Sequence, residues 1–327
     1  MYEAFYGLNA DPFRLNPDPR FYFKSPGHQK AMAYLTYGLE KAEGFVVITG
    51  DTGTGKTTLA QRLLKDLDDQ SHITATLTNT QLDPLEALQS IAQEFGLSNG
   101  LDTKPKIIEN LRRFFELHDK ASERALLIVD EAQNLPAQTL EELRMLTNLQ
   151  ADGRPLIQII FLAQPHFTDM IDRPGFAQFR ERVGAAVDLD RLRRSDIKGY
   201  VEHRLSVAGW TGDPQITDAA FDLIFETTGG LPRRINKFLA RSLLAAFLDE
   251  RHEIDTPLVA QVKAELREDP SWKEDILPAT ALDDGPSAPP LNKGLESRIS
   301  ELESEVKSIE KMLRQLLDLL VKRQHGN

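Results

Sequence analysis

The feature that most constrains this chain is a glycine-rich run at residues 50–57, GDTGTGKT, which is a complete G-x-x-x-x-G-K-[ST] pattern. It follows an apolar run at 45–49 and opens a segment of helical periodicity at 56–67, which is the strand–loop–helix context that the motif requires. Glycines let successive backbone N–H groups turn toward phosphate oxygens, and a helix N-terminus adds partial positive charge. We therefore predict a nucleotide phosphate site at Gly50, Asp51, Thr52, Gly53, Thr54, Gly55, Lys56, Thr57 and Thr58.

Two side chains of this loop and two from a second motif have predicted chemical roles. Lys56 is expected to reach the β- and γ-phosphates, and Thr57 to offer its hydroxyl to Mg²⁺. The apolar run at 125–129 ends in Asp130 and Glu131. Asp130 can complete the Mg²⁺ shell, and Glu131 can orient or deprotonate an attacking water. The two motifs together predict nucleotide hydrolysis.

The nucleotide is expected to be ATP. The guanine-selecting pattern N-K-x-D is missing, because Asn236-Lys237 is followed by Phe238 and Leu239. ATP and Mg²⁺ are therefore the predicted substrate and cofactor.

Composition narrows the class of protein. The 39 basic and 50 acidic residues give a net charge of −11, so the whole molecule is no general polyanion binder. With no cysteine there is no disulfide or cysteine-based metal site, which suits a reducing cytosol. The sequence contains no apolar stretch of the roughly 18–20 residues that a spanning helix needs, and its first residues do not form a signal peptide. We expect a cytoplasmic protein, whose association with a membrane would be peripheral.

Apolar runs alternate with helical periodicity between about 43 and 190. The expected strands are 45–49, 73–77, 125–129, 157–163 and 183–189, and the expected helices are 56–67, 84–95, 104–118 and 137–149. This alternation predicts an α/β fold with a doubly wound parallel sheet covered on both faces. Residues 191–267 show only helical periods and predict an all-helical second domain.

Three further regions complete the predicted organisation. Residues 1–42 are rich in aromatic residues and prolines, which either cover the core or wall the adenine site; an exposed partner patch is the alternative. Residues 268–294 are acidic and rich in proline, as linkers are. Apolar residues at heptad spacing predict a coiled coil at 295–322, and the charge pattern favours more than two strands or a partner helix over a parallel dimer.

Four polar residues occupy positions at which AAA+ ATPases place functional groups. Gln164 ends the run at 157–163, where it could touch the γ-phosphate or the water. Arg180 and Arg182 precede the last expected strand, where such enzymes carry the arginine that reaches a neighbouring subunit's nucleotide. Arg233 begins a helix of the second domain, from which it could contact the γ-phosphate. A solvated surface is the alternative for each arginine.

The sequence also resembles a specific family. The opening FYGL (5–8), DPF (11–13) and NPDPRF (16–21), with EGFVVITG (43–50), VDEAQNL (129–135) and GLPRRIN (230–236), is similar to the ExeA-type AAA+ ATPases of bacterial secretion and pilus systems. The likeness is strongest to the branch found with exosortase and exopolysaccharide-export loci, and covers about residues 1–265. The family's Gly-Gln-Pro is Ala163-Gln164-Pro165 here. Fuller ExeA proteins continue into a membrane span and a peptidoglycan-binding domain, whereas this chain is expected to end in a coiled coil.

The resemblance implies an AAA+ core, a helical lid and a homo-oligomer, from a dimer to a hexameric ring, with a protein partner at the cytoplasmic face of the inner membrane. The predicted function is an Mg²⁺-dependent ATPase that acts as a conformational motor in envelope secretion, exopolysaccharide export or protein sorting. A DNA-binding ATPase of the transposition type and a non-catalytic scaffold are the alternatives. The basic stretch 191–198 could contact nucleic acid, but the acidic net charge argues against a DNA-binding ATPase. The presence of Asp130 and Glu131 argues against a non-catalytic scaffold.

Overall fold

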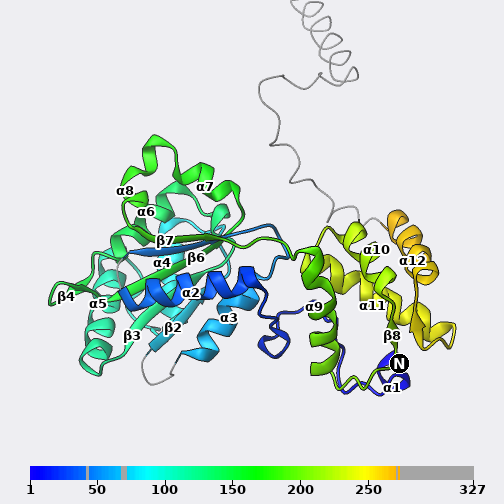
Figure 1. Ribbon diagram of the computed structural model, residues 1–327. Helices are drawn as coiled ribbons and strands as arrows, with labels where there is room; N and C mark the ends of the chain where they lie inside the picture. Colours follow the sequence, from blue (N-terminus) through cyan, green and yellow to red (C-terminus); the bar gives the residue numbers. More distant parts are fainter. Residues whose placement is uncertain (42–43, 68–71, 270–271, 273–327) are drawn as a thin grey trace, which may run out of the picture. The chain divides into compact units, whose positions relative to one another are not determined.

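The computed structural model describes residues 1–41, 44–67, 72–269 and 272, which all belong to one compact unit within residues 1–277 (Figure 1). Almost all of the predicted linker at 268–294 lies outside the described residues. The predicted coiled coil at 295–322 lies outside them altogether.

A parallel sheet forms the centre of the nucleotide-binding domain, with five strands in the order β2-β3-β6-β1-β7 among the described residues. The strands are β1 (Phe45–Thr49), β2 (His72–Leu77), β3 (Arg124–Val129), β6 (Ile157–Ala163) and β7 (Val183–Asp188). Thr49 at the end of β1 is in register with Ala163 at the end of β6. Because the strands are parallel, the residues that follow β1, β3 and β6 meet at one edge, where open α/β sheets bind their ligands.

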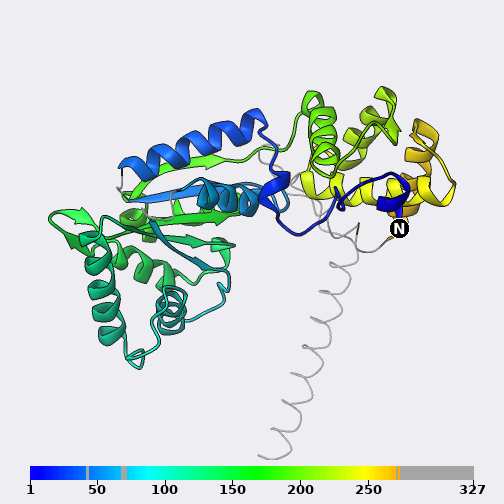
Figure 2. The same cartoon turned by 90° about the horizontal axis from the view of Figure 1, so that it is seen from below.

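Helices cover both faces of the sheet, as the alternation of strand and helix predicts. Figure 2 shows the blue α2 and the teal α5 on opposite sides of the strands. Odd and even positions of each central strand serve different cores: Phe45 and Val47 pack with α4, α5 and α6, whereas Val46 and Ile48 pack with α2 and α3. The helices are α2 (Pro26–Lys41), α3 (Lys56–Asp66), α4 (Pro84–Glu94), α5 (Lys104–Lys120), α6 (Ala137–Leu146), α7 (His166–Ile171) and α8 (Ala177–Arg180), with 3-10 turns η2 (Ala132–Asn134) and η3 (Pro174–Phe176) and a hairpin of β4 (Gln150–Ala151) and β5 (Arg154–Pro155).

The fold class predicted from the sequence is confirmed for the sheet and its flanking helices. Each strand and helix expected between 45 and 189 is present, and the bounds differ by no more than a few residues. The largest difference is at α6, which ends at Leu146 because a turn and the short hairpin at 150–155 follow it.

The second domain, here called the lid, contains α9 (Arg194–Val207), α10 (Asp218–Thr228), α11 (Pro232–Leu248) and α12 (Thr256–Glu268). The prediction that it is all helical needs one correction. Strand β8 (Gln215–Ile216) pairs in parallel with β9 (Glu253–Ile254). A two-residue strand is too short to carry an alternating pattern, so the sequence did not reveal this pair.

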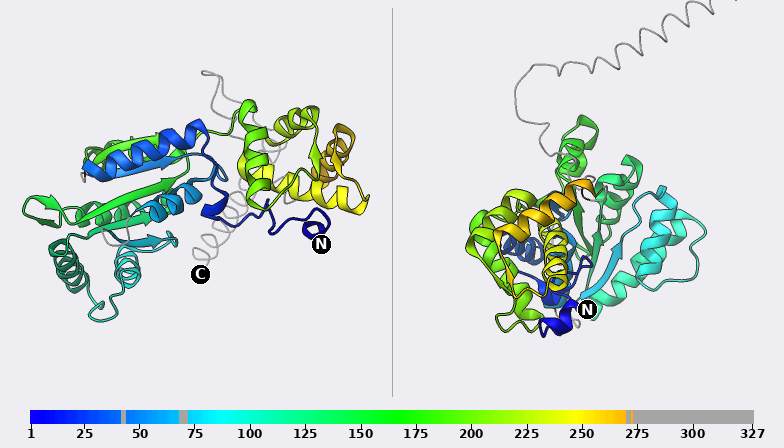
Figure 3. Two further views of the ribbon diagram at one scale, coloured as in Figure 1. Left: turned by 60° about the horizontal axis from the view of Figure 1, so that its bottom comes forward. Right: turned by 90° about the vertical axis from the view of Figure 1, so that its right-hand side faces the viewer.

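The N-terminal segment divides between two hydrophobic cores. Tyr6, Leu8, Phe13 and Phe21 are buried among the lid residues, so α1 (Tyr2–Phe5) and η1 (Pro19–Phe21) belong with the lid. Figure 3 shows α1, in dark blue at the label N, near the yellow α11. Tyr22 and the buried face of α2 pack instead on the sheet. The chain therefore crosses from the lid to the sheet within its first 26 residues.

Candidate functional site

The glycine-rich loop connects β1 to α3, whose first residue is Lys56. Gly55 precedes the helix with a φ of 104°, in the left-handed region that favours glycine. The buried ammonium of Lys56 donates to the backbone carbonyls of Gly50 at 2.8 Å and Asp51 at 3.1 Å. These two hydrogen bonds hold the loop around the lysine side chain. The hydroxyl of Thr54 stabilises the loop further by donating to the carbonyl of Asp51 at 3.0 Å.

The ammonium of Lys56 is buried and lies near several carboxylates. Burial lowers the pKa of Lys56, while the nearby carboxylates of Glu131, Asp130, Asp51 and Asp188 act to raise it. Its hydrogen bonds here go to carbonyl oxygens. Phosphate oxygens are stronger acceptors for an ammonium than carbonyls are, so this side chain is suited to the exchange.

The hydroxyl of Thr57 and the carboxylate of Asp130 meet in front of the loop. Thr57 donates its Oγ1 proton to Oδ2 of Asp130 at 2.8 Å, and Oδ1 of Asp130 accepts the backbone N–H of Glu131 at 2.9 Å. Among the described residues no cluster of three or more histidine, cysteine or acidic side chains is placed to hold a metal. This pair fits Mg²⁺, which takes oxygen ligands and is usually held by one or two protein groups plus phosphates and water.

Glu131 occupies an uncommon backbone conformation at the end of β3, with a φ of 51° and a ψ of 41°. Its Oε2 accepts a hydrogen bond from Nε2 of Gln133 at 2.5 Å and a longer one from Nε2 of Gln164 at 3.5 Å. The sequence predicted Glu131 and Gln164 but not Gln133. The structure brings all three together.

A cavity opens beside the loop, between the N-terminal segment and the lid. Its lining includes Thr52 and Thr58 of the predicted phosphate site, together with Glu131 and Arg233. Tyr22 and Phe23 also line it, and they belong to the aromatic segment that was predicted to cover the core or wall the adenine site. Residues that the sequence did not indicate complete the wall: Arg14, Asp18, His28, Tyr200, Arg204 and Asn236. An aromatic, hydrogen-bonding wall next to a phosphate loop is suited to the base and ribose of a nucleotide.

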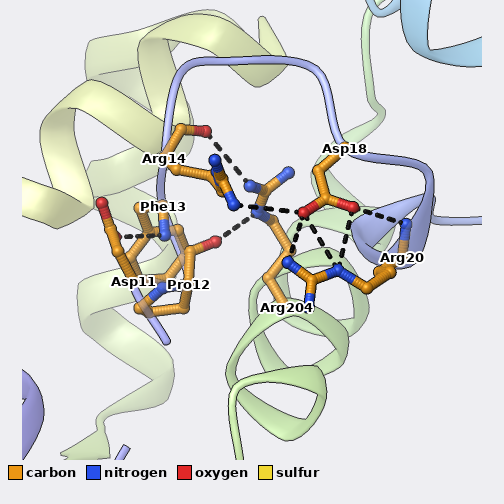
Figure 4. Close-up of polar contacts among 7 residues, drawn as sticks. All are labelled: Asp11, Pro12, Phe13, Arg14, Asp18, Arg20 and Arg204. Atoms are coloured by element: carbon orange, nitrogen blue, oxygen red, sulfur yellow. Dashed lines mark hydrogen bonds and ion pairs between the residues drawn. The ribbon is translucent and has the colours of Figure 1, made fainter. Parts of the chain in front are cut away.

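Arg204 of α9 fastens the N-terminal segment to the lid (Figure 4). Its guanidinium is buried and donates to the backbone carbonyls of Pro12 at 2.6 Å and Arg14 at 3.3 Å. Asp18 bridges Arg14 and Arg20, and the hydrogen bond from Arg20 lowers the pKa of Asp18 to about 2. These contacts fix the stretch that lines the cavity.

The lid meets the phosphate loop at two points. The backbone N–H of Arg233 donates to the carbonyl of Gly53 at 3.2 Å, and a Cβ atom on Gly53 would lie 2.5 Å from Cβ of Arg233. Position 53 therefore requires glycine for two reasons: a side chain would collide with Arg233, and the φ of 88° lies in the left-handed region that favours glycine. The second point is the ion pair of Arg191 with Asp51 at 2.7 Å. Arg233 therefore lies beside the phosphate loop, and its contact with a γ-phosphate stays a prediction.

His28 is a site residue that the sequence analysis missed. It is buried in α2, its Nδ1 lies 2.7 Å from the hydroxyl of Ser25, and a Cβ atom on Gly55 of the phosphate loop would lie 3.1 Å from its Nε2. Burial lowers the pKa of His28 to about 4, so the ring is neutral at pH 7. A lone histidine near a helix start gives no sequence signal for this contact.

Arg180 and Arg182 do not line the cavity of their own subunit. Arg180 donates to the backbone carbonyls of Ile171 at 2.7 Å and Arg173 at 3.1 Å. Arg182 donates to Oδ1 of Asn148 at 2.6 Å. Of the two, Arg180 is tied to the main chain and Arg182 to a single side chain.

Comparison with known proteins places this geometry in a family. Residues 39–171 match the family model described as AAA domain. The chain is 36% identical to general secretion pathway protein A of Aeromonas hydrophila over 285 residues, which is 86% of this chain and 52% of that protein. It is 27% identical to the ATP-dependent target DNA activator B of Escherichia phage Mu over 160 residues, 49% of each. The chain thus spans about half the length of these curated relatives. The resemblance to the ExeA-type AAA+ ATPases is confirmed, whereas the likeness to the exosortase and exopolysaccharide branch stays a prediction.

The fold has solved counterparts. The Aeropyrum pernix ORC2 protein, in its ADPNP–ADP complexes, superposes with a TM-score of 0.60 at 19% identity, covering 79% of this chain and 72% of that one. This supports an AAA nucleotide-binding fold. In the described residues, none of the helices is both long enough and apolar enough to span a membrane.

Proposed function

We propose that this chain, which carries an AAA domain and is related to general secretion pathway protein A, is an Mg²⁺-dependent ATPase that works as an oligomeric conformational motor. The observation that carries the proposal is the 2.8 Å hydrogen bond between Thr57 and Asp130. The charged groups of Lys56 and Glu131 lie close to it. This contact supports the proposal because Lys56, Thr57, Asp130 and Glu131, which phosphoryl transfer would use, all follow strands at the carboxyl edge of one sheet.

Each residue has a distinct task in the proposed reaction. Lys56 exchanges its carbonyl partners for the β- and γ-phosphate oxygens. Thr57 and Asp130 would hold Mg²⁺, which when bound supplies charge neutralisation to the phosphates. Glu131 orients the attacking water and accepts its proton. Gln164, which directly follows β6, donates a hydrogen bond to the same carboxylate. From this position it would contact the γ-phosphate and respond to its loss on hydrolysis.

Through its contacts with the phosphate loop, the lid would change its conformation when ATP is hydrolysed. Arg233 lies in the first turn of α11 and contacts the loop through its backbone at Gly53. Its side chain lines the cavity, where it would bind the γ-phosphate and be released on hydrolysis. Because Arg191 pairs with Asp51, a change in the loop also reaches the junction between the two domains.

We assign the trans-acting arginine to Arg182. A finger must leave its own subunit and enter a neighbour's site. Arg182 gives up one side-chain hydrogen bond to do so, whereas Arg180 would abandon two backbone carbonyls. This assignment makes the active form a homo-oligomer.

The likeness to general secretion pathway protein A favours a role in envelope secretion or export, exerted on a protein partner at the cytoplasmic face of the inner membrane. The match to the phage DNA activator keeps DNA binding as the second candidate. The basic stretch gives it limited support, because Arg191, Arg194 and Lys198 pair with Asp51, Asp222 and Asp218.

Nucleotide binding by the purified chain tests the proposal. We expect Mg²⁺ to tighten ATP binding, and GTP to bind at least about tenfold more weakly than ATP. Asp130→Asn should lose the Mg²⁺ enhancement, while Asp172→Asn, on the exposed end of α7, should retain it. Equal affinity for ATP with and without Mg²⁺ in the parent would contradict the assigned metal site.

A further inference from the structure

Glu131 is held in a backbone conformation that acidic residues seldom adopt. Its φ of 51° and ψ of 41° are left-handed, and such conformations persist only where neighbouring contacts hold them. The reversal turns the chain directly from β3 into η2 (Ala132–Asn134). Gln133, two residues further on, is thereby brought back to the carboxylate of Glu131.

The side-chain amide of Gln133 has only one orientation that satisfies both neighbours. Its Oε1 accepts the backbone N–H of Gln164 at 3.0 Å, and its Nε2 donates to Oε2 of Glu131 at 2.5 Å. The backbone N–H can only donate and the ionised carboxylate can only accept, so a flipped amide would lose both bonds. Gln133 thus joins the end of β6 to the carboxylate that follows β3.

We propose that Gln133 is the positioning residue of Glu131. It holds Oε2 and leaves Oε1 for the attacking water. The water oxygen then bonds to the γ-phosphorus while the bond from that phosphorus to the β–γ bridging oxygen breaks, with its electron pair leaving on ADP. One water proton passes to Oε1. This inference rests on the proposed function, because it requires Glu131 to act on the water.

The amide of Gln133 can be replaced by a carboxylate of almost the same shape. Gln133→Glu retains the shape and an acceptor for the N–H of Gln164, but turns a carboxylate toward Glu131 in place of the donor. An ionised carboxylate can only accept hydrogen bonds, so Oε2 of Glu131 would lose the donor that holds it.

Steady-state kinetics of the full chain test the proposal. Gln133→Glu is expected to lower kcat about tenfold or more and to leave the Kd for ATP within about twofold. Asn134→Asp, which adds the same charge at the neighbouring exposed position, should keep the parent's kcat. Gln133→Met, which keeps chain length without either hydrogen bond, provides a second variant and should show the loss of kcat at unchanged ATP affinity.

The outcomes separate the two proposals. If Glu131→Gln is inactive while Gln133→Glu and Gln133→Met both keep the parent's kcat, the role of Gln133 is overturned and the proposed function stands. A Glu131→Gln that hydrolyses ATP at the parent's rate would overturn both. A fall in kcat that is matched by an equal loss of ATP affinity in both Gln133 variants would show a structural role and also overturn the inference.

Discussion

Arg204 and Pro12 are 192 residues apart in the chain, yet Nε of the arginine donates to the proline carbonyl at 2.6 Å. The same guanidinium reaches the carbonyl of Arg14 and lies over the rings of Phe21 and Tyr200. Because the hydroxyl of Tyr200 donates to Oδ1 of Asn236 at 2.7 Å, the contacts continue to α11, which carries Arg233. One buried arginine therefore joins the N-terminal wall of the cavity to the lid helix.

Loss of Arg204 should weaken both stability and nucleotide affinity. Arg204→Met leaves two buried carbonyls without their donor, so we expect the free energy of unfolding to fall by about 3 kcal/mol. Arg204→Lys keeps the charge but cannot reproduce the fork, and should recover less than half of this loss. Chemical denaturation with ATP titration checks both effects, and Arg267→Met, on the last turn of α12, is the control. Parental stability of Arg204→Met would contradict the fastening role.

Stability should depend on pH through His28. Its pKa is about 4 in the folded protein and about 6.5 when unfolded, so between these values the unfolded state binds the additional proton. The free energy of unfolding should therefore fall as pH decreases from 6.5 to 4, by up to about 3 kcal/mol, and be unaffected by this group above pH 6.5. Denaturation of His28→Gln across this range should show that much less loss than the parent. The exposed His166→Gln should behave like the parent, and a His28→Gln curve parallel to the parent's would count against the assignment.

The shared active site predicts complementation between subunits. Arg182→Ala should bind ATP almost normally and hydrolyse it slowly, since trans-acting arginines contribute about 10³–10⁵ in rate where measured. Mixing it with Glu131→Gln should restore activity, because some interfaces then pair an intact Glu131 with an intact Arg182. Arg180→Ala should instead lower stability, because the carbonyls of Ile171 and Arg173 lose their donor. If oligomers that are shown to contain both variants do not regain ATPase activity, Arg182 has no trans role.

The sheet and the phosphate loop were accessible from the sequence because their signals are local. Each central strand is apolar on both faces, and the loop has a fixed spacing between a strand and a helix. Asp130 and Glu131 were found for the same reason: they end a buried strand. The structure confirms this part of the fold without changing its order.

The rest of the site depends on contacts between distant residues. Arg204 has the sequence context of an ordinary helical arginine, and its carbonyl partners lie about 190 residues away. His28 packs against the backbone of the phosphate loop at Gly55, a contact that no side-chain pattern reveals. Gln133 stands two residues after Glu131, but its role follows from the left-handed turn at Glu131, a conformation that sequence spacing does not predict.

ATP turnover by a pair of variants tests the central claim most directly. The parent should release phosphate from ATP in the presence of Mg²⁺. Lys56→Ala should neither bind ATP tightly nor hydrolyse it, because the buried ammonium supplies charge to the ground-state phosphates. Glu131→Gln should bind ATP as the parent does and release no phosphate above background, because it lacks the base for the water. Phosphate release at the parental rate by Glu131→Gln would contradict the account.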